Sequence, residues 1–504
     1  MGAEGLKAPL PARPPFPRAA TLDGFVAGLL RRARVPGLSL GLVRRGRRVL
    51  ARGYGYRDRE AKLPASERTV YGIASMTKSF TALAVLRLEE EGSLRVDDPL
   101  VRHLPEFRTP APRWTRKVTL GHLLSHASGL PPLPSIYYTS ARSLRRAPPY
   151  DPRVARRVGV DPDHAPIDTY EGLLDYLGTE RYRWLGPPGA QFSYSNEGFG
   201  LLGAVIERAS GRTYESFLEE EIFRPAGFSR TTFDTGVMFR SPEVTTLYSP
   251  DWTHPGRPLV ASDEWWEDTC LRAAGAIRTN VEDLLRYLEI YLDDGRVGGE
   301  RVVSAKSVAA MLTPRIEISP GLHYGYGIAV RPDFHGHRLA FHDGGLKGVS
   351  SQFAVLPDAK VGGCVLANSD MAPVDRVLEE GITGLLGLPR TARFVDIPPA
   401  GPRPASLAEY AGWYCSGEGI WVRVTPRRGH LRFDFHGIEV TAKGLKLGPH
   451  GGDGFVLRQG GRRAWLEFVR DRAGRIVALR QGWRIVRRRS TRELPLARRG
   501  RMVW

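Results

Sequence analysis

Hydrophobic residues recur along this 504-residue chain with two different periods. Spacings of three and four residues predict helices, whereas alternation, or a short apolar run between turn residues, predicts strands. The first two strand patterns are joined by a turn at Gly46 and predict a hairpin. Helical patterns cover residues 21–35, 75–91, 119–125, 196–210, 214–223, 281–292 and 374–386, and strand patterns cover residues 37–43, 49–55, 324–330, 338–341, 351–356 and 362–367.

The order of these elements predicts the fold class. Helices at both ends of a run of antiparallel strands favour an α+β fold, an α/β sandwich in which helices flank an antiparallel sheet. The helices between the hairpin and the later strands are expected to form an all-helical subdomain. Residues 131–170 are rich in Pro and Arg with little periodicity. We expect a long loop or insertion there, either a lid or a disordered segment.

The pattern changes near residue 389. Five prolines between residues 389 and 404 predict an extended linker. Beyond the linker, short alternating segments separated by Gly-rich turns predict a small all-β barrel or sandwich. These segments are residues 421–425, 430–435, 455–457 and 465–469. We therefore expect a disordered arm at residues 1–20, a main domain at 21–388, the linker at 389–404 and a β-barrel domain at 405–504.

Composition indicates a globular protein without a membrane segment. Hydrophobic residues make up 42% and charged residues 25% of the chain. No apolar run approaches the roughly 20 residues that span a bilayer, and the N-terminus lacks the apolar core of a signal peptide. Cys270, Cys364 and Cys415 are widely separated, without metal-site spacing. A sparse, odd number of cysteines fits a reducing compartment, so a cytoplasmic protein is predicted, without membrane association.

The chain is strongly basic, with 73 Lys and Arg against 54 Asp and Glu and a formal net charge of +19. Such a balance can indicate nucleic acid, an acidic substrate or a membrane surface as partner. However, the arginines are spread along the chain, and no nucleic-acid-binding motif accompanies the dense run between Arg484 and Arg501. Enrichment in Arg with scarce Asn more often reflects genome composition or heat adaptation. No nucleic-acid partner is predicted.

Ser75 and Lys78 are the first candidate catalytic pair, in the single Ser-x-x-Lys of the chain. A serine at a helix N-terminus lies near free backbone N–H groups that can stabilise an oxyanion. A lysine three residues later lies on the same helix face, and when buried it can lose its proton at neutral pH. The alternative is that Ser75 caps the helix and Lys78 is solvated. The apolar residues around Lys78 favour the catalytic interpretation.

Tyr194 and Asn196 form a second motif, Tyr-Ser-Asn, directly before a predicted helix. The phenol of tyrosine titrates near about 10, but a cationic lysine beside it favours the phenolate, which can act as a base. The alternative is a core tyrosine followed by an asparagine that caps the helix.

A third motif, His342-Asp-Gly-Gly345, closes a predicted strand, where Gly344 and Gly345 would allow close approach of a substrate. A hairpin turn with an incidental histidine is the alternative there.

Together the three motifs resemble the active-site set of class C β-lactamases, D-alanyl-D-alanine peptidases, family VIII esterases and D-aminopeptidase-like serine hydrolases. Residues 118–130, 187–196, 274–280 and 366–369 resemble supporting segments of the same enzymes. The resemblance extends over residues 21–387 and implies a β-lactamase/transpeptidase-like fold. Residues 407–414 are similar to the start of the lipocalin-like barrels that follow some archaeal and bacterial peptidases of this family.

The resemblance implies acyl transfer with Ser75 as the nucleophile and Lys78 and Tyr194 as its proton relay. It places the oxyanion between the backbone N–H groups of Ser75 and Gly345, beside Gly344. Neither a metal nor an organic cofactor is implied. His122 and His126 have the i, i+4 spacing of a metal pair but no carboxylate beside them. We expect them to make structural hydrogen bonds.

The resemblance also assigns substrate-binding roles. Asn196 would hydrogen-bond the substrate or Lys78, and His342 would orient Tyr194 or the substrate. His342 stands where penicillin-binding enzymes usually carry lysine, and histidine occurs there in the esterase and amidase branches. A small ester, an amide or a short peptide with a D-residue is therefore the expected substrate. A β-lactamase, a D-Ala-D-Ala carboxypeptidase and a non-catalytic binding or scaffold protein are the alternatives, and a homo-oligomer is compatible with all of them.

Overall fold

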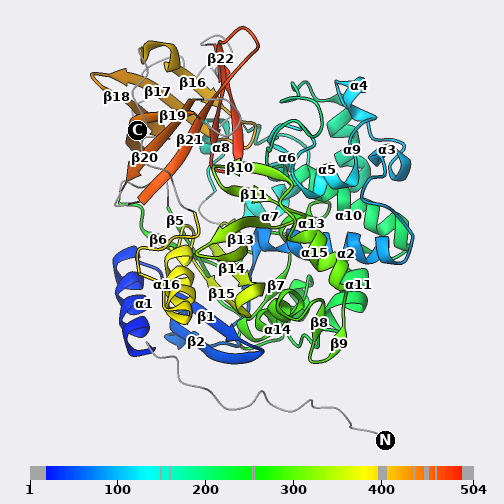
Figure 1. Ribbon diagram of the computed structural model, residues 1–504, viewed down its shortest axis with the longest axis vertical. Helices are drawn as coiled ribbons and strands as arrows, with labels where there is room; N and C mark the ends of the chain where they lie inside the picture. Colours follow the sequence, from blue (N-terminus) through cyan, green and yellow to red (C-terminus); the bar gives the residue numbers. More distant parts are fainter. Residues whose placement is uncertain are drawn as a thin grey trace, which may run out of the picture.

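The computed structural model describes residues 19–147, 150–157, 160–251, 254, 256–395, 406–435, 438–447, 453–459 and 462–490. Helices and an antiparallel sheet form the larger part, and a closed antiparallel barrel follows (Figure 1). This β-lactamase/transpeptidase-like arrangement confirms the predicted fold class. Residues 1–18 of the predicted arm and 396–404 of the predicted linker lie outside the described residues. Within the described ranges, no helix has the length and apolar character needed to cross a membrane.

The central sheet joins the two ends of the main part of the chain. Its nine strands are β1 (Gly37–Arg44), β2 (Arg47–Asp58), β3 (Leu63–Pro64), β10 (Ile316–Ser319), β11 (Leu322–Tyr324), β12 (Ala329–Phe334), β13 (His337–Leu346), β14 (Val349–Leu356) and β15 (Val361–Ala367). They lie in the order β10-β11-β12-β13-β14-β15-β1-β2-β3. The antiparallel pairing of β1 with β15 places Leu40 opposite Val365, so the N-terminal hairpin completes a sheet begun by strands some 300 residues away.

The strand predicted at residues 324–330 is instead divided between β11 and β12. Two glycines account for the break. Gly327 has a φ of +69°, and a Cβ on Gly325 would lie 2.0 Å from the Met311 carbonyl oxygen. The positive φ of Gly327 and the lack of room for a side chain at Gly325 both prevent a regular strand here.

Helices cover both faces of the sheet. They are α1 (Ala19–Ala33) and α16 (Val374–Leu386) on one face, and α2 (Thr77–Glu90) and α14 (Val281–Leu292) on the other. Alternation along β15 explains the two layers. Cys364 and Leu366 are buried in the cluster that contains residues of α2 and α14, whereas Val365 and Ala367 are buried with residues of α1 and α16. A strand buried on both faces is apolar at consecutive positions.

A helical subdomain is inserted between β3 and β10. Its helices are α3 (Leu100–His103), α4 (Pro112–Thr115), α5 (Leu120–Leu124), α6 (Ser135–Thr139), α7 (Ala141–Arg146), α8 (Pro152–Arg157), α9 (Tyr170–Thr179), α10 (Asn196–Ser210), α11 (Tyr214–Leu218), α12 (Thr235–Phe239), α13 (Arg272–Gly275) and α15 (Ala305–Met311). Short strand pairs join β4 (Tyr71–Gly72) to β7 (Arg278–Thr279), β5 (Leu247–Pro250) to β6 (Leu259–Ser262) and β8 (Arg296–Val297) to β9 (Glu300–Arg301).

Two segments of this subdomain differ from the sequence-based expectation. The segment predicted as a loop, residues 131–170, contains α6, α7 and α8, each only five or six residues long. Helices this short complete fewer than two turns, so they leave no detectable period in the sequence. The helix predicted at residues 214–223 changes from α11 to a π-helical turn at Glu219–Phe223.

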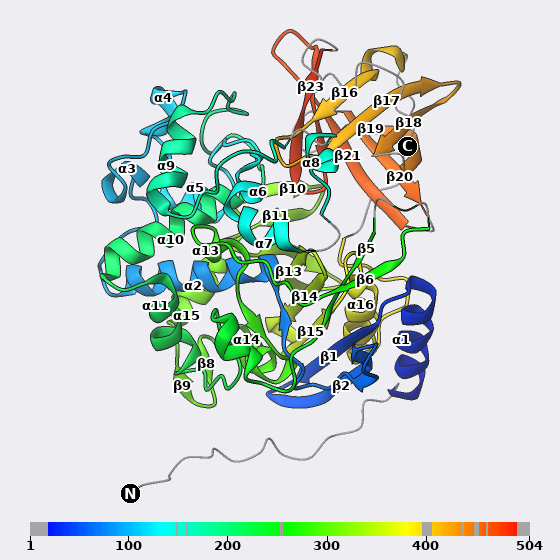
Figure 2. The ribbon, with the colours of Figure 1, turned by 180° about the vertical axis from the view of Figure 1, so that it is seen from behind.

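The barrel follows from residue 412. Its strands are β16 (Gly412–Cys415), β17 (Trp421–Arg427), β18 (His430–Phe435), β19 (Ile438–Leu447), β20 (Asp453–Gln459), β21 (Arg462–Arg470), β22 (Ile476–Gln481) and β23 (Arg484–Arg489). Pairing of β16 with β23 closes it. Tyr414, Phe433 and Phe468 belong to its apolar core. Figures 1 and 2 both place it beside the helical subdomain, at the end of the molecule away from the β1–β2 hairpin.

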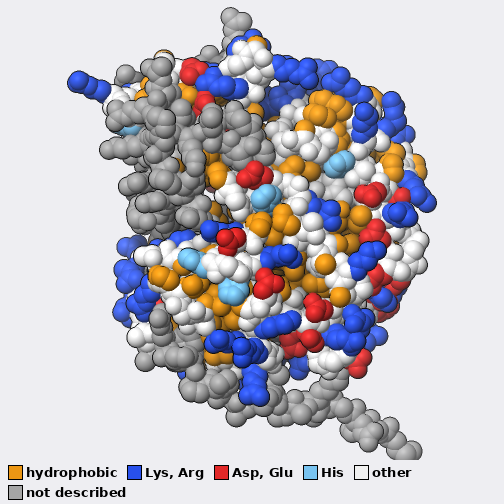
Figure 3. All heavy atoms as spheres, in the orientation of Figure 1, with side chains coloured by type: hydrophobic (Ala, Val, Ile, Leu, Met, Phe, Trp, Pro, Cys, Tyr) orange, Lys and Arg blue, Asp and Glu red, His pale blue; other side chains and the backbone are white. Residues whose placement is uncertain are grey.

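The surface is basic without a single basic patch on the face drawn in Figure 3. Lys and Arg side chains are scattered over that face, with Asp and Glu between many of them. Nucleic-acid-binding proteins gather their positive charge along one groove or stripe. The visible face therefore offers no support for such a partner.

Adjacent glycines of β13 provide a test of how closely this strand approaches the turn before α2. A Cβ on Gly344 would lie 2.1 Å from the Ile73 carbonyl oxygen, whereas a Cβ on Gly345 would meet nothing within 4 Å. Forcing an atom into a filled site typically costs about 1–3 kcal/mol. We expect Gly344→Ala to lower the melting temperature by several degrees and Gly345→Ala to leave it unchanged, as measured by differential scanning calorimetry. Equal effects of the two substitutions would contradict the close approach.

Candidate active site

Ser75 follows the buried strand β4 and lies at the start of the next helical segment. It is the middle residue of a 3-10 turn, Ala74–Met76, from which α2 continues. Ala74 has a φ of +47°, which is costly for a residue with a side chain. The cap positions of the two helical segments are Ile73 and Met76, so the alternative in which Ser75 caps the helix is wrong.

Lys78 lies one turn further on, and its side chain has no exposed surface. Its Nζ donates to Ser75 Oγ at 3.2 Å, to Asn196 Oδ1 at 2.8 Å and to the Ala274 carbonyl at 2.7 Å. Three oxygen atoms surround Nζ, so the alternative of a solvated lysine is wrong. The fold brings Lys78 of α2 together with Asn196 of α10 and Ala274 of α13.

The electrostatics of Lys78 favour its neutral form. Burial is the main reason that its pKa is well below the ordinary value of 10.5, and the positive charge of Arg484 lowers it further. A lysine with a lowered pKa can accept a proton at neutral pH. Among the three hydrogen-bond partners of Nζ, the Ser75 hydroxyl is the group that can give it a proton.

Tyr194 lies over the same amine, with Lys78 Nζ 4.8 Å from the centre of its ring. Burial raises the pKa of the Tyr194 phenol, and the Arg484 charge and a hydrogen bond with Ser75 oppose this effect. The phenolate expected from the sequence is thus disfavoured, because burial removes the water that would stabilise its charge. Burial therefore shifts the two groups in opposite directions, raising the pKa of Tyr194 and lowering that of Lys78.

Asn196 is free to contact Lys78 because its neighbour makes the helix cap. Ser195 is the N-cap of α10 and accepts from Gly198 N at 3.2 Å. Asn196, the first helical residue, instead directs Oδ1 to Lys78 and donates through Nδ2 to Glu418 Oε1 at 3.0 Å. The alternative in which Asn196 is the cap is therefore wrong.

His342 lies at the same site but does not hydrogen-bond to Tyr194 among the contacts of the described residues. Its Nδ1 contacts the Asp343 carbonyl at 2.6 Å, so this nitrogen is the donor, and Nε2 accepts from the Tyr324 hydroxyl at 2.8 Å. Burial, reinforced by Lys78, lowers the pKa of His342 to about 3. The imidazole is therefore neutral at physiological pH and contributes no positive charge.

His122 and His126 make the structural hydrogen bonds that the sequence suggested. His122 Nδ1 accepts from Thr119 N at 3.1 Å in a capping box of α5. His126 Nδ1 accepts from Ser195 N at 3.1 Å, and its ring centre lies 4.0 Å from that of Tyr194. His126 thus supports the loop that carries Tyr194.

The sequence of the chain is similar to known proteins over most of its length. The pattern of the family described as Beta-lactamase matches residues 22–388. The chain belongs to the β-lactamase family. It is 26% identical to penicillin-binding protein 4* of Bacillus subtilis (strain 168) over 424 residues, 80% of this chain and 84% of that protein. Protein flp of Staphylococcus aureus (strain MW2) is 26% identical over 382 residues, 75% of this chain and 68% of that protein.

Two solved structures are similar in fold to this chain. The octameric penicillin-binding protein homologue from Pyrococcus abyssi is 29% identical, with a TM-score of 0.65, over 90% of this chain and 96% of that one. A D-stereospecific amidohydrolase from Streptomyces sp. is 24% identical with a TM-score of 0.57 and covers 73% of this chain and 98% of its own. The second likeness concerns the fold alone.

In this β-lactamase-family protein, three residues from the barrel region contact the site, and no local sequence pattern predicts them. Glu418 lies between β16 and β17, and Trp483 and Arg484 lie at the turn from β22 to β23. Arg484 Nε donates to Glu418 Oε2 at 2.5 Å, and its guanidinium lies 4.1 Å from the centre of the Tyr194 ring. The Trp483 carbonyl accepts from Tyr194 N at 3.0 Å. The barrel therefore forms one wall of the active site.

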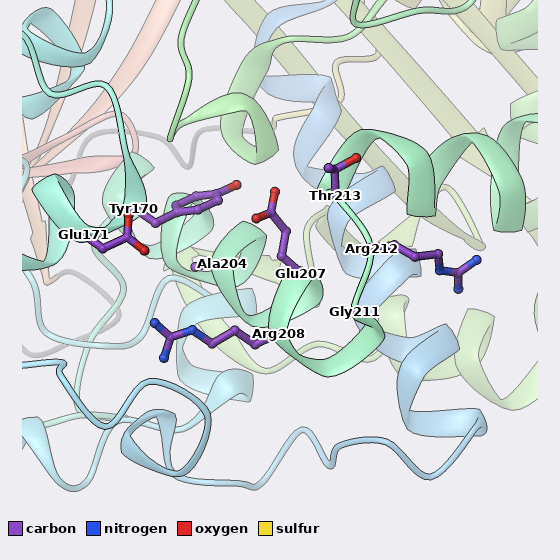
Figure 4. Close-up of a pocket in the computed structure, with 8 residues that line it drawn as sticks. All are labelled: Tyr170, Glu171, Ala204, Glu207, Arg208, Gly211, Arg212 and Thr213. Carbon is purple, nitrogen blue, oxygen red and sulfur yellow. The ribbon is translucent and has the colours of Figure 1, made fainter.

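A separate pocket of about 400 Å³ at the end of α10 has none of this chemistry (Figure 4). Its two arginines are already paired: Arg208 with Glu106, and Arg212 with Glu220 and Glu221. In Figure 4 Arg208 and Arg212 point away from each other. None of the predicted site residues lines this pocket, so it is not the active site.

Replacement of Arg484 tests its electrostatic effect on Lys78. Because the Arg484 charge lowers the pKa of Lys78, Arg484→Gln should raise that pKa. More of the amine is then protonated at a given pH, so the acidic limb of the kcat/KM profile should move to higher pH. The profile is measured with p-nitrophenyl acetate. Arg484→Lys, which keeps the charge, should shift it less.

The matched control is Arg47→Gln, which removes one charge from the exposed start of β2 and should leave the profile in place. An unchanged profile for Arg484→Gln, or a shift to lower pH, would contradict the proposed influence of Arg484.

Proposed function

We propose that this protein is a serine hydrolase that acts through an acyl-enzyme, with Ser75 as nucleophile and Lys78 as its base. The observation that carries the proposal is the 3.2 Å contact between Lys78 Nζ and Ser75 Oγ, made by an amine whose pKa is lowered by burial. The reaction class is that of the β-lactamase family, to which the chain belongs. A non-catalytic scaffold would not need this arrangement, which costs the desolvation of an amine.

The proposed reaction begins when Lys78 takes the Ser75 proton and Oγ attacks the substrate carbonyl. The tetrahedral oxyanion is stabilised by the backbone N–H groups of Ser75 and Gly345. Tyr194, which holds its proton, passes it to the leaving group and recovers one from Lys78. Water then attacks the acyl-enzyme carbonyl and gives a proton to the relay. The bond to Ser75 Oγ breaks, the relay returns a proton to this oxygen, and the acid is released. The reaction uses no metal or organic cofactor.

Glu418 and Arg484 position this relay in the proposal. A Glu418 oxygen accepts from the Asn196 amide nitrogen, which leaves the amide oxygen turned to Lys78. Arg484 holds Glu418 and supplies a positive charge over the Tyr194 ring. His342, through Tyr324, supports the same aromatic cluster. Asn196, His342 and Gly344 are thus proposed as orienting groups.

The proposed substrate is a small ester or an amide or short peptide with a D-residue. Neutral His342 offers no fixed charge for the carboxylate of a β-lactam. The name of the Streptomyces relative, a D-stereospecific amidohydrolase, agrees with the amide alternative. One observation favours a second candidate, a carboxylate-bearing β-lactam or D-Ala-D-Ala peptide: Arg484 places a cation 4.1 Å from the Tyr194 ring centre.

We also propose that residues 21–388 and 405–504 are two domains joined by a linker at 389–404. A lipocalin-like nature of the second domain, a cytoplasmic location and partners limited to small substrates stay predictions from the sequence. The printed description of the Pyrococcus abyssi homologue as octameric supports a homo-oligomer here as well.

A panel of substrates tests the proposed function. We expect p-nitrophenyl esters or D-aminoacyl amides to give a higher kcat/KM than L-aminoacyl amides or a chromogenic cephalosporin. A missing charge-assisted hydrogen bond, worth about 1.5–3 kcal/mol, would cost the cephalosporin about one to two orders of magnitude. Ser75→Ala is the control and should abolish every activity. The highest kcat/KM for the cephalosporin would replace the esterase or amidase proposal by the β-lactamase one.

A further inference from the structure

A second cavity separates the barrel from the helical subdomain. Its volume is about 440 Å³. One wall is formed by residues 131–134 and 180–185, and the other by residues 415–417 and part of β23. We call this cavity the interdomain pocket. None of the predicted site residues lines it, so it is a different site from that of Ser75.

The charges around the interdomain pocket are almost all positive. Arg181 and Arg183 line one wall, and Arg487 and Arg489 line the other, whereas Glu180 is the one acidic residue of the lining. Elsewhere the arginines of this protein are commonly paired, for example Arg208 with Glu106. In the described part of the chain, no carboxylate forms an ion pair with Arg183 or Arg487. Two walls therefore present positive charge to one space.

Arg487 is the central residue of this arrangement. Its Nη2 donates to the Trp184 carbonyl on the opposite wall, but its Nε is buried and has no hydrogen-bond partner in the described residues. Burial lowers its pKa, and so do the charges of Arg489 and Arg183. A buried donor without a partner is costly and calls for an explanation. An anion between the two walls would supply the partner and relieve the repulsion.

The remaining lining determines what kind of anion fits. Pro131, Pro132, Pro134, Leu133, Leu185 and Ile485 are apolar, and Tyr176 and Tyr182 add aromatic surface. An inorganic ion would leave this apolar surface unused. A pocket of this volume with a few polar groups in an apolar lining is typical of sites for small organic ligands.

We propose that the interdomain pocket binds a small organic oxyanion, a phosphate or carboxylate carried on an aromatic or aliphatic body, with the half-buried Arg487 as its anchor. Guanidinium groups bind both oxyanions through paired N–H donors. The apolar part of the ligand lies against the prolines and tyrosines.

The pocket is next to a loop of the active site. Ser416 and Gly417 line it, and Gly417 N donates to the Pro132 carbonyl at 3.1 Å across the two walls. The next residue, Glu418, bonds to Asn196 and Arg484. A ligand that holds both walls together also holds this loop, so ligand and substrate should strengthen each other's binding. This consequence rests on the proposed function, whereas the binding site itself does not.

Calorimetric titration of the full-length protein with phenyl phosphate and with benzoate tests the proposal and distinguishes the two oxyanions. We expect saturable 1:1 binding of at least one of them and none of neutral benzyl alcohol. Loss of a charge-assisted contact in Arg487→Gln should weaken binding at least about tenfold. Arg47→Gln removes the same charge from an exposed site and should bind as the wild type does. Arg487→Gln also removes the hydrogen bond to the Trp184 carbonyl, so its melting temperature is measured to show that the variant is folded.

Use of the Ser75→Ala variant separates this proposal from the proposed function, because binding should persist in a protein without activity. The proposal is overturned by a lack of saturable binding, by equal weakening in Arg487→Gln and Arg47→Gln, or by loss of binding after a fluorophosphonate has filled the active site.

The coupling between this pocket and the active site is tested with a p-nitrophenyl ester. Its KM should fall when phenyl phosphate or benzoate saturates the wild type, and an unchanged KM would contradict the coupling.

Discussion

Burial of the Lys78 amine is the constraint on which the rest of the active site depends. An ammonium without exposed surface must be hydrogen-bonded or lose its proton. In this structure three oxygen atoms surround Nζ. Burial and the charge of a nearby arginine also lower the pKa of the amine. The acceptors come from the 3-10 turn before α2, from α10 and from α13. The packing of the helical subdomain against the sheet therefore also creates the environment of the base.

The neighbouring groups follow from this arrangement. Tyr194 is buried by the same packing, and burial acts on its phenol in the opposite direction, raising the pKa. The same environment therefore favours Lys78 as the proton acceptor and Tyr194 as the proton carrier. The Arg484 guanidinium lies over the Tyr194 ring, and the Arg484–Glu418 pair fixes the orientation of Asn196. A site that looks complete in the main sheet and helices thus includes part of the barrel.

Much of this could be predicted from the sequence, and the reasons are local. Ser75 and Lys78 are one turn apart on a helix with an apolar face, and helices such as 196–210 and 281–292 have their predicted bounds because their apolar periods span several turns. Short elements such as α6 and α7 were not predictable, since they complete fewer than two turns. Arg484 was visible only as one of many arginines. Its place over Tyr194 depends on how two distant parts of the chain pack, and no local pattern encodes that contact.

The most direct test of the account is the pH dependence of Ser75 acylation by a fluorophosphonate, with the adduct mapped by mass spectrometry. If Lys78 is the buried base, the inactivation rate should reach its plateau at a pH well below 10.5, the ordinary pKa of lysine. Lys78→Ala should remove this titration together with most of the rate. A rate that keeps rising until pH 10.5, or an adduct on a serine other than Ser75, would contradict the account.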